Sequence, residues 1–321
     1  GQSGDWRAAF VQPLGQRRPN MRVIPSTSEL DTLREAGKIA SNARNWAAEA
    51  IKPGLFLREL QEGMETMIRE AGAMPSFPAQ TSCNHIAAHS CASPTDSTRF
   101  EENDLVKIDV GAHIDGFVVD TGVSADLSLD GRWSGLIGAA SDALEAAIAM
   151  CSPGIAVDDI GERVDEVITE AGFSPIFNLT GHGLGRWTLH DKPQIPNARM
   201  GSTATLDAGM IFAIEPFATS GEGYVEDEGA PEVFMLARSP KLSNKIDPQV
   251  LAEIKSWNGL PIARRYFSHL PRKPFERTLK ELIKQRVARE YPPLAEVSGA
   301  HVGWKEHSIY LGPGGPEVLT T

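Results

Sequence analysis

The feature that most constrains the fold of this chain is an internal repeat with a spacing of one hundred residues. The segment PGLFLRELQEGMETMIREAGAMPSF (53–77) aligns without gaps with PGIAVDDIGERVDEVITEAGFSPIF (153–177). Each copy opens with a Pro-Gly turn, continues with apolar residues at helical spacing and reaches Glu-Ala-Gly, which is typical of a helix end. The repeat therefore predicts two equivalent helices in two similar halves of one domain.

The residues that follow each copy extend the similarity. IAAH ends in His89 and WTLH ends in His190, and we expect each histidine to end a strand. A further apolar strand with an acid comes next, namely VKIDV with Asp109 and IFAIEPF with Glu215. The order helix, histidine, acid-bearing strand predicts an α+β domain with internal two-fold pseudosymmetry, whose functional groups converge on the axis.

Acidic residues also interrupt two other apolar strands. LVKIDVGAHIDGFVVDTG (105–122) reads as a buried hairpin that carries Asp109 and Asp120, and HVGWKEHSIYLG places Glu306 in a third strand. A buried carboxylate needs a cation to stay charged. We expect Lys107 and Lys305 to point away from the acids, because neighbours along a strand face opposite sides.

Metal ions fit this set of acids better than side-chain cations. Four carboxylates and the imidazole of His182, in TGHGLG, form a mixed oxygen and nitrogen set that suits Mn, Fe(II), Co or Zn. Four acids are enough to bridge two divalent ions. Taken singly, a strand acid or a histidine is more often an ordinary polar residue, but the ordered set favours a metal site.

The remaining segments suggest the domain organisation. At 321 residues the chain suits one large domain or two modest ones. We interpret residues 1–24 as a disordered leader or cloning remnant, with Met21 a plausible native start. Residues 25–238 and 301–321 form the predicted catalytic domain. Residues 239–300 form a predicted helical insertion between neighbouring strands.

Charge and cysteine content limit the partners and the compartment. The net charge of −11 argues against general binding of nucleic acid, although residues 239–300 carry 12 Lys/Arg against 6 Asp/Glu. Solvated helix faces explain this segment most simply; the sharper alternative is weak, salt-sensitive docking on ribosomal RNA through Arg264, Arg265, Arg272 and Lys273. No apolar run is long enough for a membrane helix. Three cysteines favour free thiols in a reducing cytosol.

Several motifs together resemble one enzyme family. FPAQTSCNHIAAHS, the Asp109–Asp120 hairpin, NLTGHGLGRWTLH, MIFAIEPFAT, YPPLAEVSG and EHSIY…VLTT are similar to methionine aminopeptidase of the type II class, in its archaeal short form. The resemblance covers roughly residues 28–321. It implies the pseudo-two-fold "pita-bread" fold with a central antiparallel sheet. The eight-residue spacing of His182 and His190 and the helical insertion favour type II over its relatives.

The resemblance also implies roles for individual residues. Asp109 would hold one divalent ion, and His182 with Glu215 the other. Asp120 and Glu306 would bridge the two, and Glu215 would also shuttle a proton. The implied catalytic histidines and the implied substrate contacts are His89 and His190, together with Phe77 and Tyr291 at the methionine side chain. The implied substrates are the N-termini of nascent polypeptides, cleaved before a small second residue by a cytoplasmic monomer without membrane or specific DNA contacts.

Two features depart from the family pattern, and two alternatives stay open. Lys305 replaces an aromatic residue beside Glu306, and Ser90 replaces a tyrosine after His89. The alternatives are an Xaa-Pro peptidase on the same fold and, less in keeping with a complete ligand set, a non-catalytic relative that binds protein or RNA.

Overall fold

The computed structural model describes residues 25–321 as an α+β protein, so the leader expected at residues 1–24 lies outside the described residues. The helices are α1 (Thr27–Ala50), α2 (Leu57–Glu70), α3 (Ser134–Met150), α4 (Val157–Glu170), α5 (Pro248–Ser256), the short 3-10 helix η2 (Arg264–Phe267) and α6 (Arg272–Lys284). The strands are β1 (Met74–Pro75), β2 (Gln80–Cys83), β3 (Ile86–Ala88), β4 (Leu105–Ile114), β5 (Phe117–Asp126), β6 (Ser174–Pro175), β7 (Thr180–Gly185), β8 (Thr188–Pro196), β9 (Ile211–Ile214), β10 (Phe217–Thr219), β11 (Val225–Asp227), β12 (Val233–Leu236), β13 (Ile262–Ala263), β14 (Ala288–Tyr291), β15 (Leu294–Glu296), β16 (Val302–Gly312) and β17 (Gly315–Val318). Within residues 25–321, no helix combines the length and apolar character needed to cross a bilayer.

The two copies of the sequence repeat form equivalent helices, as predicted. Helix α2 and helix α4 each span fourteen residues and begin one hundred residues apart. Both end two residues before a glycine with positive φ, Gly72 at 86° and Gly172 at 87°, a backbone conformation that glycine adopts without strain. The Pro-Gly turns before the helices are also alike, because the N–H groups of Gly54 and Gly154 donate to Phe100 and Leu206. The pseudosymmetry is therefore present in the backbone.

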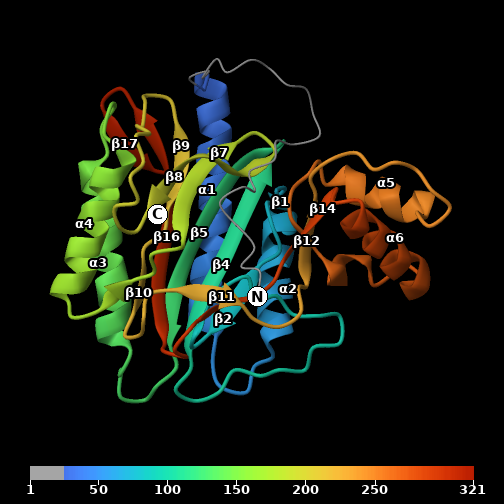
Figure 1. Cartoon of the computed structure of the whole chain (residues 1–321), viewed down its shortest axis with the longest axis horizontal. Helices are drawn as coiled ribbons and strands as arrows, with labels where there is room; N and C mark the ends of the chain where they lie inside the picture. The colour runs from blue at the N-terminus through green and yellow to red at the C-terminus, as the bar shows by residue number, and fades with distance from the viewer. Residues whose placement is uncertain (1–24) are drawn as a thin grey trace.

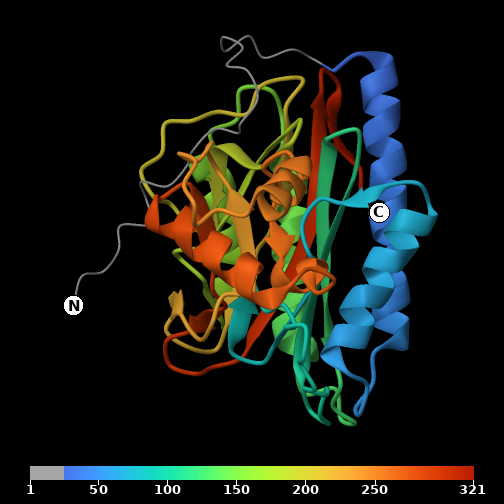
Figure 2. The ribbon, with the colours of Figure 1, turned by 90° about the vertical axis from the view of Figure 1, so that its right-hand side faces the viewer.

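Two pairs of helices pack on one face of a large, curled antiparallel sheet. Its main strand order is β1-β4-β5-β16-β9-β7-β8, with eleven strands in all. Helices α1 and α2 pack on the half built from β4 and β5, and α3 with α4 on the half that contains β9 and β16. Figure 1 shows α3 and α4 at one side of the curled sheet, and Figure 2 shows α1 and α2 covering its back. The predicted α+β class with a central antiparallel sheet is confirmed.

The β4–β5 hairpin forms where the sequence predicts it. Asp115 and Gly116 make its tight turn, with φ of 50° and 82°. Asp109 pairs with Gly122, and Gly111 pairs with Asp120. The two acids are therefore diagonal neighbours on one face of the sheet rather than directly opposite. Neighbouring rings fill the space beside the two glycines, because a Cβ at Gly122 would lie 1.9 Å from Trp304 and a Cβ at Gly111 would lie 2.5 Å from Phe77.

Two predicted strand positions were wrong in detail. Glu215 lies between β9 and β10 rather than inside a strand, because Pro216 has no N–H to continue the ladder. His190 is the third residue of β8 rather than the end of a strand. His89, by contrast, follows directly after β3.

The segment expected to be a helical insertion contains strands as well as helices. Helix α5 starts after Asp247, whose side chain caps the N–H groups of Gln249 and Val250 as the sequence suggests. Strands β13 and β14 pair with β12 in a separate three-stranded sheet, so β12 and β16 are not the neighbouring strands we expected. Figure 1 shows this unit beside the main sheet. The division at residues 239–300 stays a proposal, and the pairing of β12 with this unit favours an earlier start.

A buried ion pair joins this unit to the main body. The guanidinium of Arg265 in η2 contacts the carboxylate of Glu65 in α2, and both side chains are 3% exposed. Tyr266 donates a hydrogen bond to the same carboxylate at 2.6 Å, as does the Ala79 N–H at 3.0 Å. Arg264, 20% exposed, pairs with Glu276 and Glu290. Neither arginine is therefore available as the free surface cation that we expected for RNA docking.

Candidate metal centre

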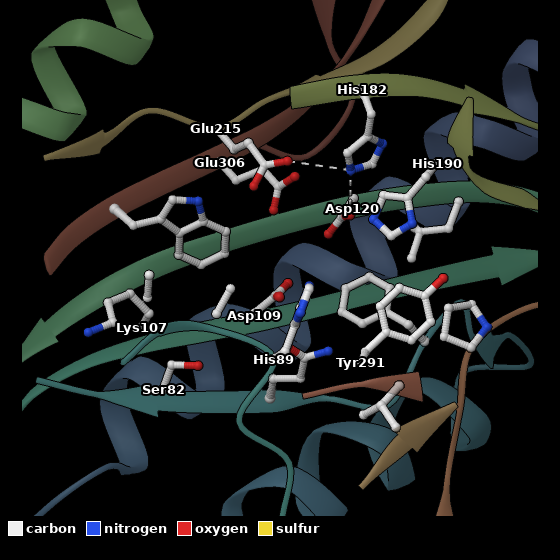
Figure 3. Close-up of a pocket in the computed structure, with 18 of the residues that line it drawn as sticks. Ser82, His89, Lys107, Asp109, Asp120, His182, His190, Glu215, Tyr291 and Glu306 are labelled. Carbon is white, nitrogen blue, oxygen red and sulfur yellow. Dashed lines mark ion pairs between the residues drawn. The ribbon is translucent and has the colours of Figure 1, made fainter. Parts of the chain in front are cut away.

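One pocket brings together every residue that the sequence analysis assigned to the active site. The proposed metal ligands, both catalytic histidines and both candidate methionine contacts line the same cavity. They are Phe77, His89, Asp109, Asp120, His182, His190, Glu215, Tyr291 and Glu306. Figure 3 shows the labelled side chains of this set pointing into the cavity.

The ligand candidates come from adjacent strands of the sheet. Asp109 of β4, Asp120 of β5 and Glu306 of β16 lie on three neighbouring strands, and Glu306 pairs with Gly122, two residues from Asp120. His182 of β7 pairs with Ala213 of β9, which places it near Glu215 at the end of that strand. The antiparallel sheet thus gathers residues that are up to about two hundred positions apart.

The distances between these groups fit a shared cation. Nε2 of His182 lies 3.7 Å from Oδ2 of Asp120 and 3.5 Å from Oε1 of Glu215. Such separations exceed a good hydrogen bond but match two atoms that are each about 2.1 Å from one ion. Ligand atoms of Asp120, His182 and Glu306 all lie within 4.8 Å of one another.

Several carboxylate oxygens in the pocket have no protein partner. Oδ1 of Asp109, Oδ1 of Asp120 and Oε1 of Glu306 are buried without a hydrogen bond. Buried polar atoms are nearly always satisfied in folded proteins. Three unsatisfied oxygens that face one cavity therefore fit the expected divalent ions, and hard oxygen ligands with one imidazole suit the metals named above.

Burial and mutual repulsion disfavour the charged form of these acids. Burial raises the pKa of Asp120 to about 7. Burial, followed by the charge of Asp120, raises the pKa of Asp109 and of Glu306 well above the ordinary value. The pKa of Glu215 is raised for the same two reasons. Without cations, four carboxylates in this space do not all stay ionised, so the protein alone does not balance their charge.

The histidines of the pocket are neutral. Burial lowers the pKa of His89 and of His182 to about 4. Burial and the neighbouring His182 and His89 lower the pKa of His190 well below its ordinary value. A neutral imidazole has one N–H donor and one acceptor nitrogen. His182 can therefore offer a lone pair to a metal, and the other two can donate hydrogen bonds to a substrate.

Tyr291 lies between the two candidate catalytic histidines. Its ring meets His89 edge-on, with 5.6 Å between the ring centroids, and stacks on His190 at a centroid distance of 6.2 Å. The ring centroids of His190 and His182 lie 4.5 Å apart. His89 has a φ of 67°, a left-handed conformation that is uncommon for a residue with a side chain. Such backbone strain persists where the surrounding structure enforces it and often occurs at functional sites.

The apolar end of the pocket depends on a glycine of β4. Phe77 is 3% exposed and packs with Leu184, Leu189 and Leu260. A Cβ at Gly111 would lie 2.5 Å from the Phe77 ring, so a larger residue there would displace it. Phe77 and Tyr291 together give the pocket an apolar wall.

The pocket is also lined by residues that sequence reasoning did not select. Among them are Gln80, Lys107 and Trp304. Lys107 is two residues from Asp109 and shares its face, so our expectation that it points away was wrong; its ammonium donates to Asn84 O at 2.7 Å. The two-residue period of a strand would have found Lys107, and also Trp304, two residues before Glu306. Gln80 pairs with Asp109 across strands, which only the register reveals.

The two departures from the family pattern have different places in the structure. Lys305 points away from Glu306, as expected, and donates to Ser141 Oγ of α3 at 2.9 Å. Ser90 follows His89, and its backbone N–H donates to Ser82 Oγ while its carbonyl accepts from Thr81 N–H. Neither change removes a group from the pocket.

Known proteins match most of this chain. The profile of metallopeptidase family M24 matches residues 31–238. A methionine aminopeptidase of Archaeoglobus fulgidus is 41% identical over 291 residues, which cover 90% of this chain and 98% of that protein. The methionine aminopeptidase of Pyrococcus horikoshii is 38% identical over 286 residues, covering 88% and 96%.

Solved structures show the same fold at lower identity. The methionine aminopeptidase of Thermotoga maritima superposes with a TM-score of 0.68 and 24% identity, covering 94% of this chain and all of that one. The prolidase of Pyrococcus furiosus superposes with a TM-score of 0.61 and 20% identity, covering 94% of this chain and 66% of that one. A thermophilic Arx1 superposes with a TM-score of 0.81 and 15% identity, covering 92% of this chain and 91% of that one. Proteins named methionine aminopeptidase, prolidase and Arx1 thus share the pita-bread fold.

Proposed function

We propose that this chain removes the initiator methionine from nascent proteins, because it belongs to metallopeptidase family M24. Within that family it is a methionine aminopeptidase, which is a metallo-aminopeptidase. It would hydrolyse the first peptide bond and prefer a small second residue. The observation that supports this proposal most strongly is the gathering of four acids and three neutral histidines around one pocket with unsatisfied carboxylate oxygens.

The proposed ligand set divides between two ions. Asp109 would hold one ion, His182 and Glu215 the other, and Asp120 and Glu306 would bridge them. The diagonal placement of Asp109 and Asp120 on adjacent strands and the short distances around His182 are consistent with this division. When bound, two divalent ions supply Lewis-acid chemistry and a water-derived nucleophile near neutral pH. Co, Mn, Fe(II) and Zn all suit the donor set.

The protein itself would manage the protons and the developing charge. Glu215 lies at the pocket and would take a proton from the attacking water and pass it to the leaving amine. His190 and His89, both neutral, would each donate an N–H, one to the developing oxyanion and one near the scissile amide. A neutral imidazole keeps its N–H proton while the amine departs, so it remains a hydrogen-bond donor throughout the reaction.

The apolar wall of the pocket would select the methionine side chain. Phe77 and Tyr291 line it, and an unbranched thioether adapts to such a narrow apolar space better than a β-branched side chain does. The α-amine of the substrate would bind on the Asp109 side, which restricts cleavage to the first residue.

Peptide hydrolysis after chelation tests the proposal. We expect the stripped protein to be inactive toward Met-Gly-Met and to recover when Mn²⁺, Co²⁺, Fe²⁺ or Zn²⁺ is added back. Asp120→Ala should stay inactive with every ion. Hydrolysis that is equally fast in excess chelator would refute the metal-dependent mechanism.

A matched pair of substrates separates the nearest alternative. An Xaa-Pro peptidase on this fold would cleave Ala-Pro peptides and leave Met-Gly-Met intact. A non-catalytic relative would cleave neither and bind no divalent ion. We expect rapid cleavage of Met-Gly-Met and little of the Ala-Pro peptide.

We also propose a weak, salt-sensitive association with ribosomal RNA through helix α6. Its exposed cations include Arg272, Lys273, Arg277 and Lys280. Neutralising these four should release the protein from co-sedimenting ribosomes at low salt, whereas neutralising the exposed Lys38 and Lys52 on the main body should not. Equal co-sedimentation of all variants would leave the basic face as ordinary solvated surface.

The compartment and the assembly state follow as proposals from the same reasoning. Cys83, Cys91 and Cys151 are free thiols, which is consistent with a reducing cytosol. The pocket takes all its proposed groups from one chain, so a monomer would be competent.

A further inference from the structure

Strand β16 changes neighbours beside the proposed bridging ligands. It pairs with β5 over Lys305–His307 and with β9 over His307–Tyr310. The ladder with β5 therefore stops opposite Thr121, one residue short of Asp120. Beyond that point the hydroxyl of Ser308 replaces the ladder, because it accepts from the Asp120 N–H and donates to the Asp120 carbonyl, both at 2.8 Å.

The segment after β17 fills the place beside this break. The Leu319 N–H donates to Ser308 O at 2.8 Å. Thr320 is completely buried, and its hydroxyl oxygen accepts from the Ser308 N–H at 3.0 Å and lies 3.0 Å from Nδ1 of His307. One hydroxyl thus holds both residues of β16 that follow Glu306.

A buried arginine of α1 connects Thr320 to the second strand. Nη1 of Arg44 donates to Thr320 O at 2.8 Å and to Thr121 Oγ1 at 2.6 Å, and that hydroxyl donates to Glu306 O at 3.0 Å. Nε and Nη2 of Arg44 both donate to Oδ1 of the neutral Asn45. Arg44 is only 7% exposed, so its charge is buried against hydroxyl, carbonyl and amide oxygens. Burying a charged group costs free energy, so we expect the buried guanidinium of Arg44 to have a role beyond packing.

We propose that Arg44 and Thr320 form a positioning clamp that holds Asp120 and Glu306 at the spacing required to bridge two divalent ions. The clamp touches no ligand oxygen. It holds the Ser308 N–H through Thr320 and the Glu306 carbonyl through the Thr121 hydroxyl that Arg44 contacts. It deepens the proposed function, because it rests on the same two-ion site. Residues that orient ligands from behind typically change metal affinity by about 10–100-fold when they are removed.

Substitutions that differ only in the hydroxyl test the clamp. Thr320→Val keeps the shape and removes the hydroxyl, and Thr320→Ser keeps the hydroxyl. We expect the dissociation constant for Mn²⁺, measured by calorimetry on the chelator-stripped full chain, to rise about 10–100-fold in Thr320→Val and to stay near wild type in Thr320→Ser. At saturating Mn²⁺, kcat and KM for Met-Gly-Met should return to within about twofold of wild type.

Helix α1 provides a matched control for the arginine. Arg44→Met should weaken Mn²⁺ binding as Thr320→Val does. Arg34→Met removes another arginine of the same helix, one that pairs at the surface with Glu317 of β17, and it should leave Mn²⁺ affinity unchanged. If Thr320→Val does not fold, Thr320→Ala removes the same hydroxyl without the added methyl contact.

The possible results separate the clamp from the proposed function. Equal Mn²⁺ affinity in wild type and Thr320→Val, or equal weakening by Arg34→Met, overturns the clamp. A kcat that stays low in Thr320→Val at saturating Mn²⁺ also overturns it, since the effect would then not lie in metal affinity. A wild-type protein that binds Mn²⁺ but does not cleave Met-Gly-Met refutes the proposed activity and leaves the clamp to be judged on affinity alone.

Discussion

His190 shows how burial prepares a single residue for its proposed role. It lies between Tyr291 and His182, and burial keeps its imidazole neutral, so one ring nitrogen carries a hydrogen that can face a developing oxyanion. We predict that His190→Ala lowers kcat toward Met-Gly-Met by about 10²–10³-fold, the usual effect of losing one such donor. Steady-state kinetics at saturating metal measure this change.

The metal content of the same variant separates catalysis from metal binding. His190 is not among the proposed ligands, so Mn²⁺ stoichiometry in His190→Ala should equal that of wild type. A variant that loses metal together with activity would show that His190 acts on the centre and not on the substrate.

Residue identities carried most of the information about the site, and side-chain direction carried the rest. The ligand candidates were recognisable because acids rarely occur in apolar strands. The direction of Lys305 followed from adjacency to Glu306, whereas Lys107, two residues from Asp109, shares its face and lines the pocket. Gln80 was not found because cross-strand register is set by the hairpins and not by local pattern.

At the scale of elements, the buried pair between Arg265 of η2 and Glu65 of α2 is the main test of how the small sheet-and-helix unit is attached. Without Arg265, the buried Glu65 carboxylate keeps, within residues 25–321, only the longer ionic contact with Arg69 at 3.8 Å, and removing one partner of a buried pair typically costs about 3–5 kcal/mol. We predict that Arg265→Met lowers the free energy of unfolding by this amount. Urea unfolding of the metal-loaded protein measures it.

The exposed Arg272 supplies the comparison for this prediction. Arg272→Met, at the start of α6, should change stability by no more than about 0.5 kcal/mol. The double variant Arg265→Met with Glu65→Gln should lose less than the sum of its single variants, because neither charge is then stranded. Equal stability of Arg265→Met and Arg272→Met would mean that the pair does not hold the unit in place.

Elements with strong local signals were predictable, and those defined by distant pairing were not. The paired helices α2 and α4 were marked by the repeat, and α5 by its Asp-Pro start. Helix α6 begins at Arg272 and contains Pro274 in its first turn, where proline is tolerated. Strands β13 and β14 are short and gain their stability from β12, so no local pattern announces them.

For the whole molecule, the acidic centre predicts an unusual pH dependence of the metal-free state. The pKa of Asp120 is raised in the folded protein to about 7, so the folded state binds more protons than the unfolded state between about pH 4 and 7. Stability from this group is therefore present at low pH and is lost as pH rises through 7. Asp120→Asn removes this dependence and leaves the buried histidines unchanged.

The quantity to measure is the difference in the free energy of unfolding between wild type and Asp120→Asn. We predict that metal-free wild type loses stability relative to metal-free Asp120→Asn as pH rises from 4 to 7 in urea unfolding, and that Mn²⁺ removes this loss in wild type only. If the free energies of unfolding of the two metal-free proteins changed in parallel with pH, the folded protein would not raise the pKa of Asp120.

The overall architecture could be derived from the sequence because the repeat reveals the pseudosymmetry, and the two halves then require a shared sheet. What the sequence did not reveal is the break between β5 and β16 beside the ligands, since it depends on Thr320 and Arg44 meeting from opposite ends of the chain. Long-range contacts of this kind have no local signature.

The most direct test of the central claim is a titration of the chelator-stripped protein with Mn²⁺ in which bound metal and methionine release from Met-Gly-Met are followed together. The account predicts that activity appears only with bound Mn²⁺ and that binding saturates at two ions per chain. Release of methionine at full rate before any Mn²⁺ is bound, or saturation without any release, would contradict it.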